Sequence, residues 1–217
     1  MPTSATPESL RDAAEYLTKA DAVLAPIIMI AGTASIIPNK NYYQELVESI
    51  ISQQLSVKAA ATILKRFLGL FSGDEFPTPG HILEKDIEEL RSVGLSRQKA
   101  TYIQDLAVKV LEGTVRFNHL DALSNDAVIA ELTKIKGVGV WTVHMFLIFC
   151  MGRLDVLPTG DLGIKNGIYS LYQLNEKPTP EEMEKIAKKN KWHPYESVAS
   201  WYVWHSLDNK PAVGGAS

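Results

Sequence analysis

Two glycines separated by one residue, Gly137 and Gly139, join what the hydrophobic periodicity predicts to be two helices. The second helix begins at once, so the amide N–H groups from Gly137 to Trp141 lie at a helix N-terminus. There they lack intrahelical partners, and the helix dipole favours an anion. Glycine also lets a bulky phosphate approach the backbone closely. An ordinary turn that uses glycine only for its conformation is the alternative, and the two glycines alone do not decide between them.

A carboxylate follows at a defined spacing. Asp161 lies twenty residues after Trp141, in the segment Leu157-Pro158-Thr-Gly-Asp161, where proline and glycine interrupt the chain and a new helix is expected. The commonest role of Asp at such a place is the N-cap, which accepts a hydrogen bond from the free amides of the first turn. A capping carboxylate is also rigidly aimed. The same side chain can therefore face a cleft and take part in chemistry.

The elements that must position these residues are helices. Helical periodicity runs through nearly the whole chain, strand alternation is almost absent, and the pattern predicts an all-α protein. Three helices are expected to begin with Thr capping the amides and Pro at the first helical position, the last with Glu182 completing a capping box. These starts are Thr6-Pro7, Thr78-Pro79 and Thr179-Pro180. The segment 140–151 is apolar nearly all round and should form a central buried helix.

Composition sets the remaining limits. The chain has 217 residues, 46% of them hydrophobic, which excludes a mostly disordered protein. Its net charge of -3 is a mild objection to a nucleic-acid binder. The single cysteine, Cys150, excludes an intramolecular disulfide and any four-cysteine zinc or iron–sulfur site. The start of the chain has no signal-peptide pattern, and the longest apolar stretch, 22–37, is too short for a bilayer. We expect an intracellular protein, in the cytoplasm and nucleoid or in a nucleus, without a membrane partner.

The chain resembles the helix-hairpin-helix DNA glycosylases, most closely the DNA-3-methyladenine glycosylase II family. The resemblance lies in the glycine hairpin, the Leu-Pro-x-x-Asp segment, their order and their spacing. Residues 43–60 resemble the early helix and DNA-wedge loop of that family, residues 90–100 its G-x-x-x-x-K-A turn, and residues 199–204 its closing helix. The resemblance covers about 21–207, and the ordered combination is more specific than any one motif. It fits the short form, without the N-terminal β-domain of some bacterial members.

The resemblance implies a two-lobed helical fold with the active-site cleft between the lobes. We expect one lobe at 40–153, a second at 1–39 together with 154–208, and a flexible tail at 209–217. The implied activity is that of a monofunctional glycosylase, which hydrolyses the N-glycosidic bond of 3-methyladenine and 7-methylguanine in duplex DNA as the first step of base excision repair. We expect a monomer whose partner is double-stranded DNA. The alternatives are a catalytically silent helix-hairpin-helix protein that binds damaged DNA and a helical protein–protein module.

The resemblance also implies roles for single residues. Asp161 would be catalytic: a fixed carboxylate stabilises positive charge on the sugar and orients or deprotonates the attacking water. Trp141, Trp204 and His144 would line the base pocket, because indole faces attract a cationic alkylated base. Core packing is the alternative for all three. Relatives that also nick the strand carry Lys at the position of Trp141, so no lyase activity is expected here.

Contacts to DNA are implied at two loops. The wedge that fills the place of a flipped nucleotide would come from Gln53, Gln54 and Leu55, with Gln54 preferred, although a polar helix end is the alternative. Phosphate would be held by the backbone amides of the hairpin and by nearby lysines, whose alternative is solvated surface. The phosphate-binding residues are Gly137, Gly139, Val140, Lys136 and Lys165. A structural Na⁺ or K⁺ would bind the backbone carbonyls of Thr133, Ile135 and Gly137, and no cofactor is expected for the chemistry.

Overall fold

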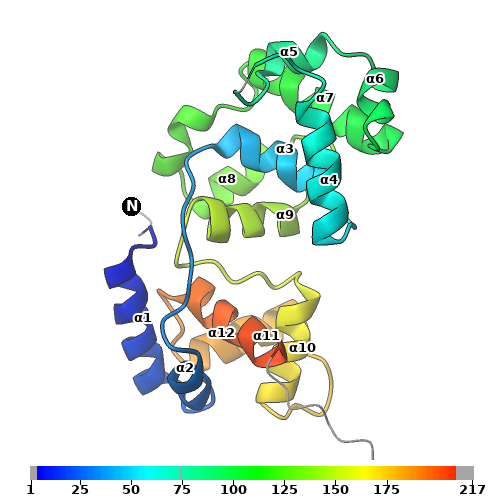
Figure 1. The fold of residues 1–217 in the computed structure, drawn as a ribbon. Coiled ribbons are helices and arrows are strands. Elements are labelled where there is room, and N and C mark those ends of the chain that lie inside the picture. The colour runs from blue at the N-terminus through cyan, green and yellow to red at the C-terminus, as the bar shows by residue number, and fades with distance from the viewer. Residues whose placement is uncertain (1–3, 74, 209–217) are drawn as a thin grey trace, which may run out of the picture. The chain divides into compact units, whose positions relative to one another are not determined.

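The computed structural model describes residues 4–73 and 75–208. Within these ranges every regular element is helical, and the sole β pairing is an isolated antiparallel bridge between Ser4 and Arg153. The all-α prediction is confirmed (Figure 1). The chain divides into two compact units. We call the one formed by the described residues up to Asn39 and from Leu147 onward the split unit, and the one formed by Lys40–Phe146 the continuous unit.

The split unit contains five α-helices. α12 packs against α10 and also contacts α1 and α2. The approach of α10 to α12 requires a glycine, because a Cβ atom on Gly167 would lie 2.3 Å from Cγ1 of Val203. The helices are α1 (Pro7–Ala20), α2 (Ala25–Ala31), α10 (Leu162–Leu171), α11 (Pro180–Lys189) and α12 (Glu196–Asp208).

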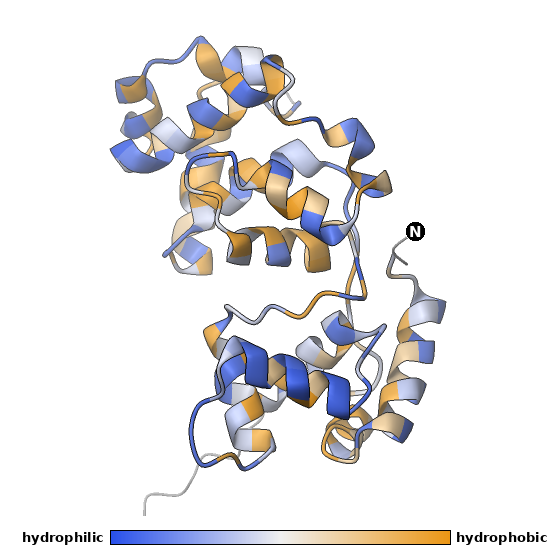
Figure 2. Ribbon diagram, turned by 180° about the vertical axis from the view of Figure 1, so that it is seen from behind, coloured by the Kyte–Doolittle hydropathy of each residue, from blue (hydrophilic) through white to orange (hydrophobic). Residues whose placement is uncertain are grey.

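The continuous unit is built around α7, which packs against α3, α5 and α6. α3 also contacts α4, and α8 contacts α9 across the glycine hairpin. Along most helices hydrophobic residues gather on one side (Figure 2), as expected for amphipathic helices around a core. The elements are α3 (Tyr42–Ser52), α4 (Val57–Leu68), α5 (Pro79–Leu83), α6 (Ile87–Ser92), α7 (Arg97–Leu111), the 3-10 helix η1 (Phe117–Ala122), α8 (Asn125–Leu132) and α9 (Val140–Met145).

The capping predictions are confirmed. Thr6, Thr78 and Thr179 each accept a hydrogen bond from the backbone N–H three residues later, and Glu182 completes the capping box of α11. Asp161 is the N-cap of α10, as its place after the Pro/Gly segment indicated. Each such cap stabilises its helix by about 1 kcal/mol.

The prediction of one buried helix over 140–151 is wrong. α9 ends at Met145, and a π-helical turn, η2 (Phe146–Cys150), follows. Val143 and Leu147 are fully buried, but Val140 and Trp141 are 51% and 48% exposed. The reason is that α9 begins directly at the hairpin, so Val140 is exposed and Trp141 lines a groove rather than the core.

The boundary between the two units lies between Phe146 and Leu147. The lobe boundary predicted from the sequence lies at 153/154, and the expected tail, 209–217, falls outside the described residues. In the part of the chain that the structure covers, no helix is both long and apolar enough to cross a membrane.

Candidate active site and nucleic-acid interface

The carboxylate of Asp161 is held by two hydrogen bonds from different helices of the split unit. Its Oδ1 accepts from the backbone N–H of Ile164 at 2.8 Å and from the indole Nε1–H of Trp204 at 2.9 Å. The first bond is the N-cap of α10, and the second comes from α12. A Cβ atom on Gly163 would lie 2.9 Å from Asp161 Oδ1 and 3.0 Å from Trp204 Cδ1. Gly163 therefore makes room for this pair.

A second aromatic ring accompanies Trp204. The ring of Phe149 lies 5.7 Å from that of Trp204, centroid to centroid, with a tilt of 32°, and 41% of Phe149 is exposed. The apolar pattern of 140–151 predicts Phe149 only as part of a buried helix. No spacing rule would have found it, because the π-helical turn changes which side of the segment each residue faces. Lys165, expected at a phosphate, lies on α10 one turn after Asp161.

The two hairpin glycines serve different purposes. Gly137 has a positive φ of 79°, and a Cβ atom there would lie 2.0 Å from the ring of Tyr102. Gly139 is the N-cap of α9 in extended conformation, with no atom near the place of its missing Cβ. Gly137 is thus required by the packing of the turn. Gly139 leaves the start of α9, including the amide of Val140, open to an approaching group.

Asp105 of α7 anchors the hairpin. Its Oδ2 accepts the backbone N–H of Lys136 at 2.9 Å, and its Oδ1 lies 3.2 Å from Lys109 Nζ and 3.5 Å from Lys136 Nζ. Burial raises the pKa of Asp105, but the hydrogen bonds from Lys136 and Lys109 outweigh it and hold that pKa below its usual value. The charge of Lys136 is therefore shared with a carboxylate.

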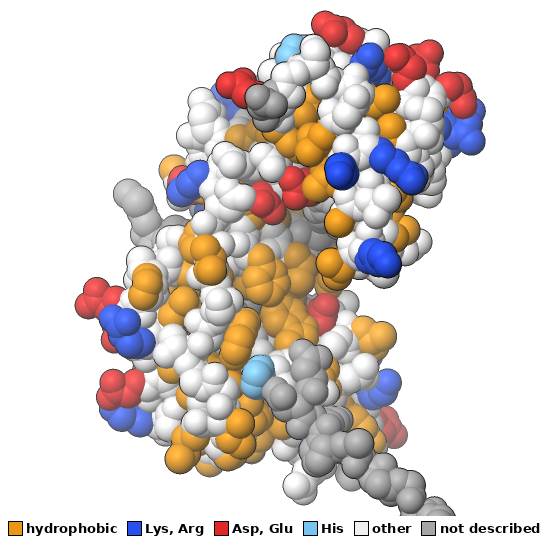
Figure 3. All heavy atoms as spheres, viewed as in Figure 1, with side chains coloured by type: hydrophobic (Ala, Val, Ile, Leu, Met, Phe, Trp, Pro, Cys, Tyr) orange, Lys and Arg blue, Asp and Glu red, His pale blue; other side chains and the backbone are white. Residues whose placement is uncertain are grey.

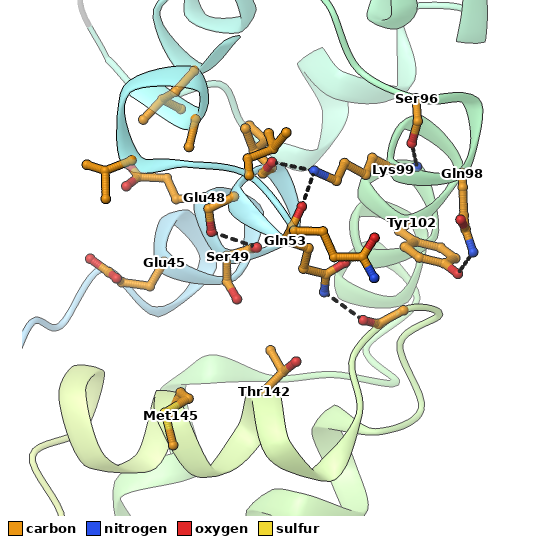
Figure 4. Close-up of a pocket in the computed structure, with 18 of the residues that line it drawn as sticks. Glu45, Glu48, Ser49, Gln53, Ser96, Gln98, Lys99, Tyr102, Thr142 and Met145 are labelled. Carbon is orange, nitrogen blue, oxygen red and sulfur yellow. Dashed lines mark hydrogen bonds between the residues drawn. The ribbon is translucent and has the colours of Figure 1, made fainter. Parts of the chain in front are cut away.

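The expected wedge lies in the turn between α3 and α4. The side-chain amide of Gln53 donates to the carbonyl of Gly137 at 2.9 Å, which ties this turn to the hairpin. Gln54 is exposed, with a positive φ of 55°, and Leu55 is 38% exposed. Lys99, part of the G-x-x-x-x-K-A turn, donates from Nζ to the carbonyls of Ile51 at 2.8 Å and Gln53 at 2.6 Å (Figure 4). Burial lowers the pKa of the Lys99 ammonium.

The wedge turn, Lys99 and Tyr102 of α7, and the start of α9 surround one groove of about 1100 Å³ in the continuous unit. It brings together the expected wedge residues, Gly137 of the hairpin and Trp141 of α9. Figure 4 shows Gln53, Lys99 and Tyr102 on one side of the groove and Thr142 and Met145 on another. His144 does not line it. Its Nδ1 is buried without a hydrogen-bond partner among the described residues, and burial lowers its pKa.

Comparisons with known proteins show the family to which the chain belongs. The family model described as HhH-GPD superfamily base excision DNA repair protein matches residues 47–192, which is more than half of the chain. The chain belongs to the HhH-GPD superfamily. This confirms the resemblance to the helix-hairpin-helix DNA glycosylases and the expected fold class.

Two yeast proteins and a solved structure illustrate the relation to this superfamily. An alkylbase DNA glycosidase-like protein of Schizosaccharomyces pombe is 34% identical, over 88% of this chain and 91% of its own. DNA-3-methyladenine glycosylase 1 of the same organism is 38% identical, over 76% of this chain and 72% of its own. A structure of the 3-methyladenine DNA glycosylase of this yeast in complex with abasic DNA matches with a TM-score of 0.78 at 33% identity, covering 91% of this chain and 97% of that one.

The cation expected at an HhH-GPD hairpin can be tested against the carbonyls of Thr133, Ile135 and Gly137. The carbonyl of Ile135 accepts the N–H of Val138 at 3.1 Å, and that of Gly137 accepts the Gln53 amide. A carbonyl oxygen has two lone pairs, so each keeps one direction for a cation, and oxygen ligands suit Na⁺ or K⁺. The carbonyls of Ile135 and Gly137 can therefore each take one further partner, such as a cation. The described residues hold no cluster of three or more His, Cys, Asp or Glu side chains that could bind another metal.

Proposed function

We propose that this protein is a monofunctional DNA glycosylase that releases alkylated purines, such as 3-methyladenine and 7-methylguanine, from duplex DNA as the first step of base excision repair. The observation that carries the proposal is the Asp161 carboxylate, held by the amide of Ile164 and the indole of Trp204. The name of a relative supports the substrate class, since the Schizosaccharomyces pombe protein that matches this chain in sequence and in structure is named a 3-methyladenine glycosylase. Action as a monomer inside the cell is part of the proposal.

The reaction breaks the bond between C1′ of the deoxyribose and the purine nitrogen. The base departs with the bonding electrons, and positive charge develops on the sugar. Asp161 stabilises that charge, because a carboxylate fixed by two donors needs little reorganisation as the charge forms. A water oxygen then bonds to C1′ and gives its proton to Asp161. The products are the free base and an abasic site. An alkylated purine is a cation before it leaves and departs neutral, so no general acid is required.

Aromatic faces supply the selectivity for a cationic base. In the split unit Trp204 lies beside Phe149, and in the continuous unit Trp141 presents a half-exposed ring to the groove. A cation over an indole face gains up to about 2 kcal/mol when water is excluded. We assign Phe149 to the same role as Trp204, beside which it lies, and leave His144 out. Since position 141 carries no amine, no Schiff base forms on the sugar and the strand is not nicked.

Two loops of the continuous unit contact DNA in this proposal. Gln54 is the wedge, because its side chain is exposed, whereas that of Gln53 is already bonded to Gly137. Leu55 adds an apolar surface beside it. The amides of Gly137, Gly139 and Val140, with Lys136, bind phosphates, and Lys165, on α10 of the split unit, adds a further phosphate contact. A Na⁺ or K⁺ ion held by the carbonyls of Thr133, Ile135 and Gly137 would add positive charge facing a phosphate.

The decisive experiment is Asp161→Asn, assayed by release of radiolabelled 3-methyladenine and 7-methylguanine from methylated duplex DNA. The amide keeps the size of the side chain and removes its charge, so release should fall by at least about 100-fold. Binding to a duplex with an abasic site should stay within a few-fold of wild type.

Asp86→Asn is the matched control. Asp86 is also a helix N-cap, and its side chain accepts the N–H of Glu89 at 2.8 Å. The control should keep wild-type release. Near-wild-type release by Asp161→Asn would overturn the catalytic role of Asp161. DNA binding by the wild type without release of any base would overturn the glycosylase proposal and favour the silent damage-binding protein.

A further inference from the structure

α4 carries only positive charge. Its twelve residues, Val57–Leu68, include Lys58, Lys65 and Arg66 and no Asp or Glu. None of these three cations forms an ion pair or a side-chain hydrogen bond with the residues that the structure describes. The exposed positive charge of α4 is thus not neutralised by the protein itself.

Other cations of the continuous unit differ from those of α4. Several are paired with carboxylates on their own or a neighbouring element. The pairs are Lys40–Asp121, Lys85–Glu89, Arg91–Glu88, Arg97–Glu88, Lys109–Asp105 and Lys136–Asp105. The concentration of unpaired positive charge on one helix therefore needs a reason beyond general solubility.

Two of these cations form a stripe with small residues between them. Lys58 and Lys65 are seven residues apart, which is close to two helical turns, so they lie on the same side of α4, about 10 Å apart along its axis. Ala61 and Thr62 lie between them and are exposed. We call these four residues the α4 stripe. Phosphates of one DNA strand follow each other at about 3.4 Å along the duplex axis, so the stripe spans about three nucleotides, with no bulky side chain in the way.

Helix stability does not account for Lys58. Lys65 and Arg66 lie in the last turn of α4, where the dipole favours cations, but Lys58 lies in the first turn, where it favours anions. A cation there destabilises the helix. Other helices of this unit have acidic residues in the first turn, for example Glu88 and Glu89 of α6. The charge of Lys58 acts against the fold, which indicates a role in binding.

The stripe is continuous with the groove. α4 begins directly after the wedge turn, with Ser56 as its N-cap, and Val57, Ala60, Ala61 and Leu64 line the groove together with Gln54 and Trp141. Figure 3 shows blue side chains over the surface that α4 forms in Figure 1. A duplex whose strand reaches the wedge turn would pass along this helix.

We propose that the α4 stripe binds the phosphates of the DNA strand that flanks the wedge, so that the DNA-binding surface extends well beyond the hairpin. This inference rests on the proposed function, because it takes duplex DNA as the partner. Charge complementarity explains the unpaired cations, and the small residues between them explain how a sugar-phosphate backbone comes close. It also explains how a chain with a net charge of -3 binds a polyanion.

The test is the salt dependence of binding to a duplex with a single abasic site, measured by fluorescence anisotropy between 50 and 200 mM KCl. The variant is Lys58→Ala/Lys65→Ala. The slope of log K against log salt is negative, and each lost phosphate contact makes it shallower by about 0.9. The slope of the double variant should therefore be shallower than that of the wild type by about 1.8. Lys58→Ala alone should keep or raise the thermal midpoint, since it removes an unfavourable charge at a helix start.

The matched control is Lys185→Ala/Lys189→Ala on α11, which removes the same charge from two exposed lysines of another helix. Its slope should stay at the wild-type value. An unchanged slope for the α4 variant, or an equal loss in the control, would overturn the α4 stripe. Base release and the slope test the two proposals independently. If the wild type binds DNA but releases no base, the proposed function fails, and the slope still shows whether the α4 stripe binds phosphate. If the wild type does not bind duplex DNA, both proposals fail.

Discussion

The indole N–H of Trp204 donates a hydrogen bond of 2.9 Å to the same Asp161 oxygen that caps α10. One carboxylate oxygen thus joins the start of α10 to α12. Aromatic packing and donation by Trp204 can be separated by substitution, because Phe keeps the ring beside Phe149 and lacks the donor. This relationship leads to the first prediction.

Trp204→Phe should lower the kcat for release of 3-methyladenine by about 10- to 100-fold, which corresponds to the ~1.5–3 kcal/mol of a hydrogen bond to a charged group. KM should change by less than about threefold, since the ring face remains. Steady-state kinetics on methylated duplex DNA measure both. Trp201→Phe is the control on the same helix, because Trp201 stacks on His205 with ring centroids 5.1 Å apart and should tolerate the change. A kcat for Trp204→Phe equal to that of Trp201→Phe would show that the indole N–H does not position Asp161.

The local parts of this site could be predicted from the sequence. The N-cap at Asp161 and the turn at Gly137 depend on neighbouring residues, whose chemistry leaves a pattern within a few positions. Only one of the two reasons for glycine at position 137 could be predicted from the sequence. Its positive φ is a local requirement, but the ring of Tyr102 that excludes a Cβ atom comes from a distant helix.

Contacts between distant segments could not be predicted in this way. Lys99 is 46 positions from Gln53, whose carbonyl it binds, and nothing in its local pattern distinguishes it from a solvated lysine. Phe149 was missed because a π-helical turn interrupts the regular helix that its apolar run suggested. Periodicity arguments assume a constant turn angle. They fail where an irregular turn changes that angle, as the π-helical turn does here.

The second prediction separates the two glutamines of the wedge turn. Gln54 has a positive φ, which glycine adopts without strain, so Gln54→Gly should keep or raise the thermal midpoint. It should nevertheless lower base release by about 10-fold or more, because no side chain fills the place of the flipped nucleotide. The fluorescence of 2-aminopurine placed next to the lesion reports on flipping directly and should rise less than with wild type.

Gln53→Ala is the contrasting variant. It removes the hydrogen bond to Gly137 and should lower the free energy of unfolding by about 0.5–1.5 kcal/mol, as measured with urea. Its flipping signal should stay closer to that of wild type than the signal of Gln54→Gly. A larger loss of flipping in Gln53→Ala would reassign the wedge to Gln53.

The third prediction concerns His144, whose pKa is lowered by burial in the folded protein. Because the unfolded chain then binds a proton more readily than the folded protein, the free energy of unfolding rises with pH in this range. Stability should therefore fall as the pH drops below about 6.5, the ordinary pKa of histidine. His144→Leu removes this titration and keeps an apolar side chain, so its stability should depend less on pH between 7.5 and 5.5.

Urea unfolding at several pH values across that range measures the difference. His81→Leu is the matched control, since His81 lies exposed on α5. We expect the wild type and the His81 variant to lose stability in parallel on acidification, while the His144 variant loses less. Because Nδ1 of His144 is buried without a partner among the described residues, no neighbouring carboxylate compensates for protonation there. If all three proteins lost stability equally between pH 7.5 and 5.5, His144 would not be the group that titrates on unfolding.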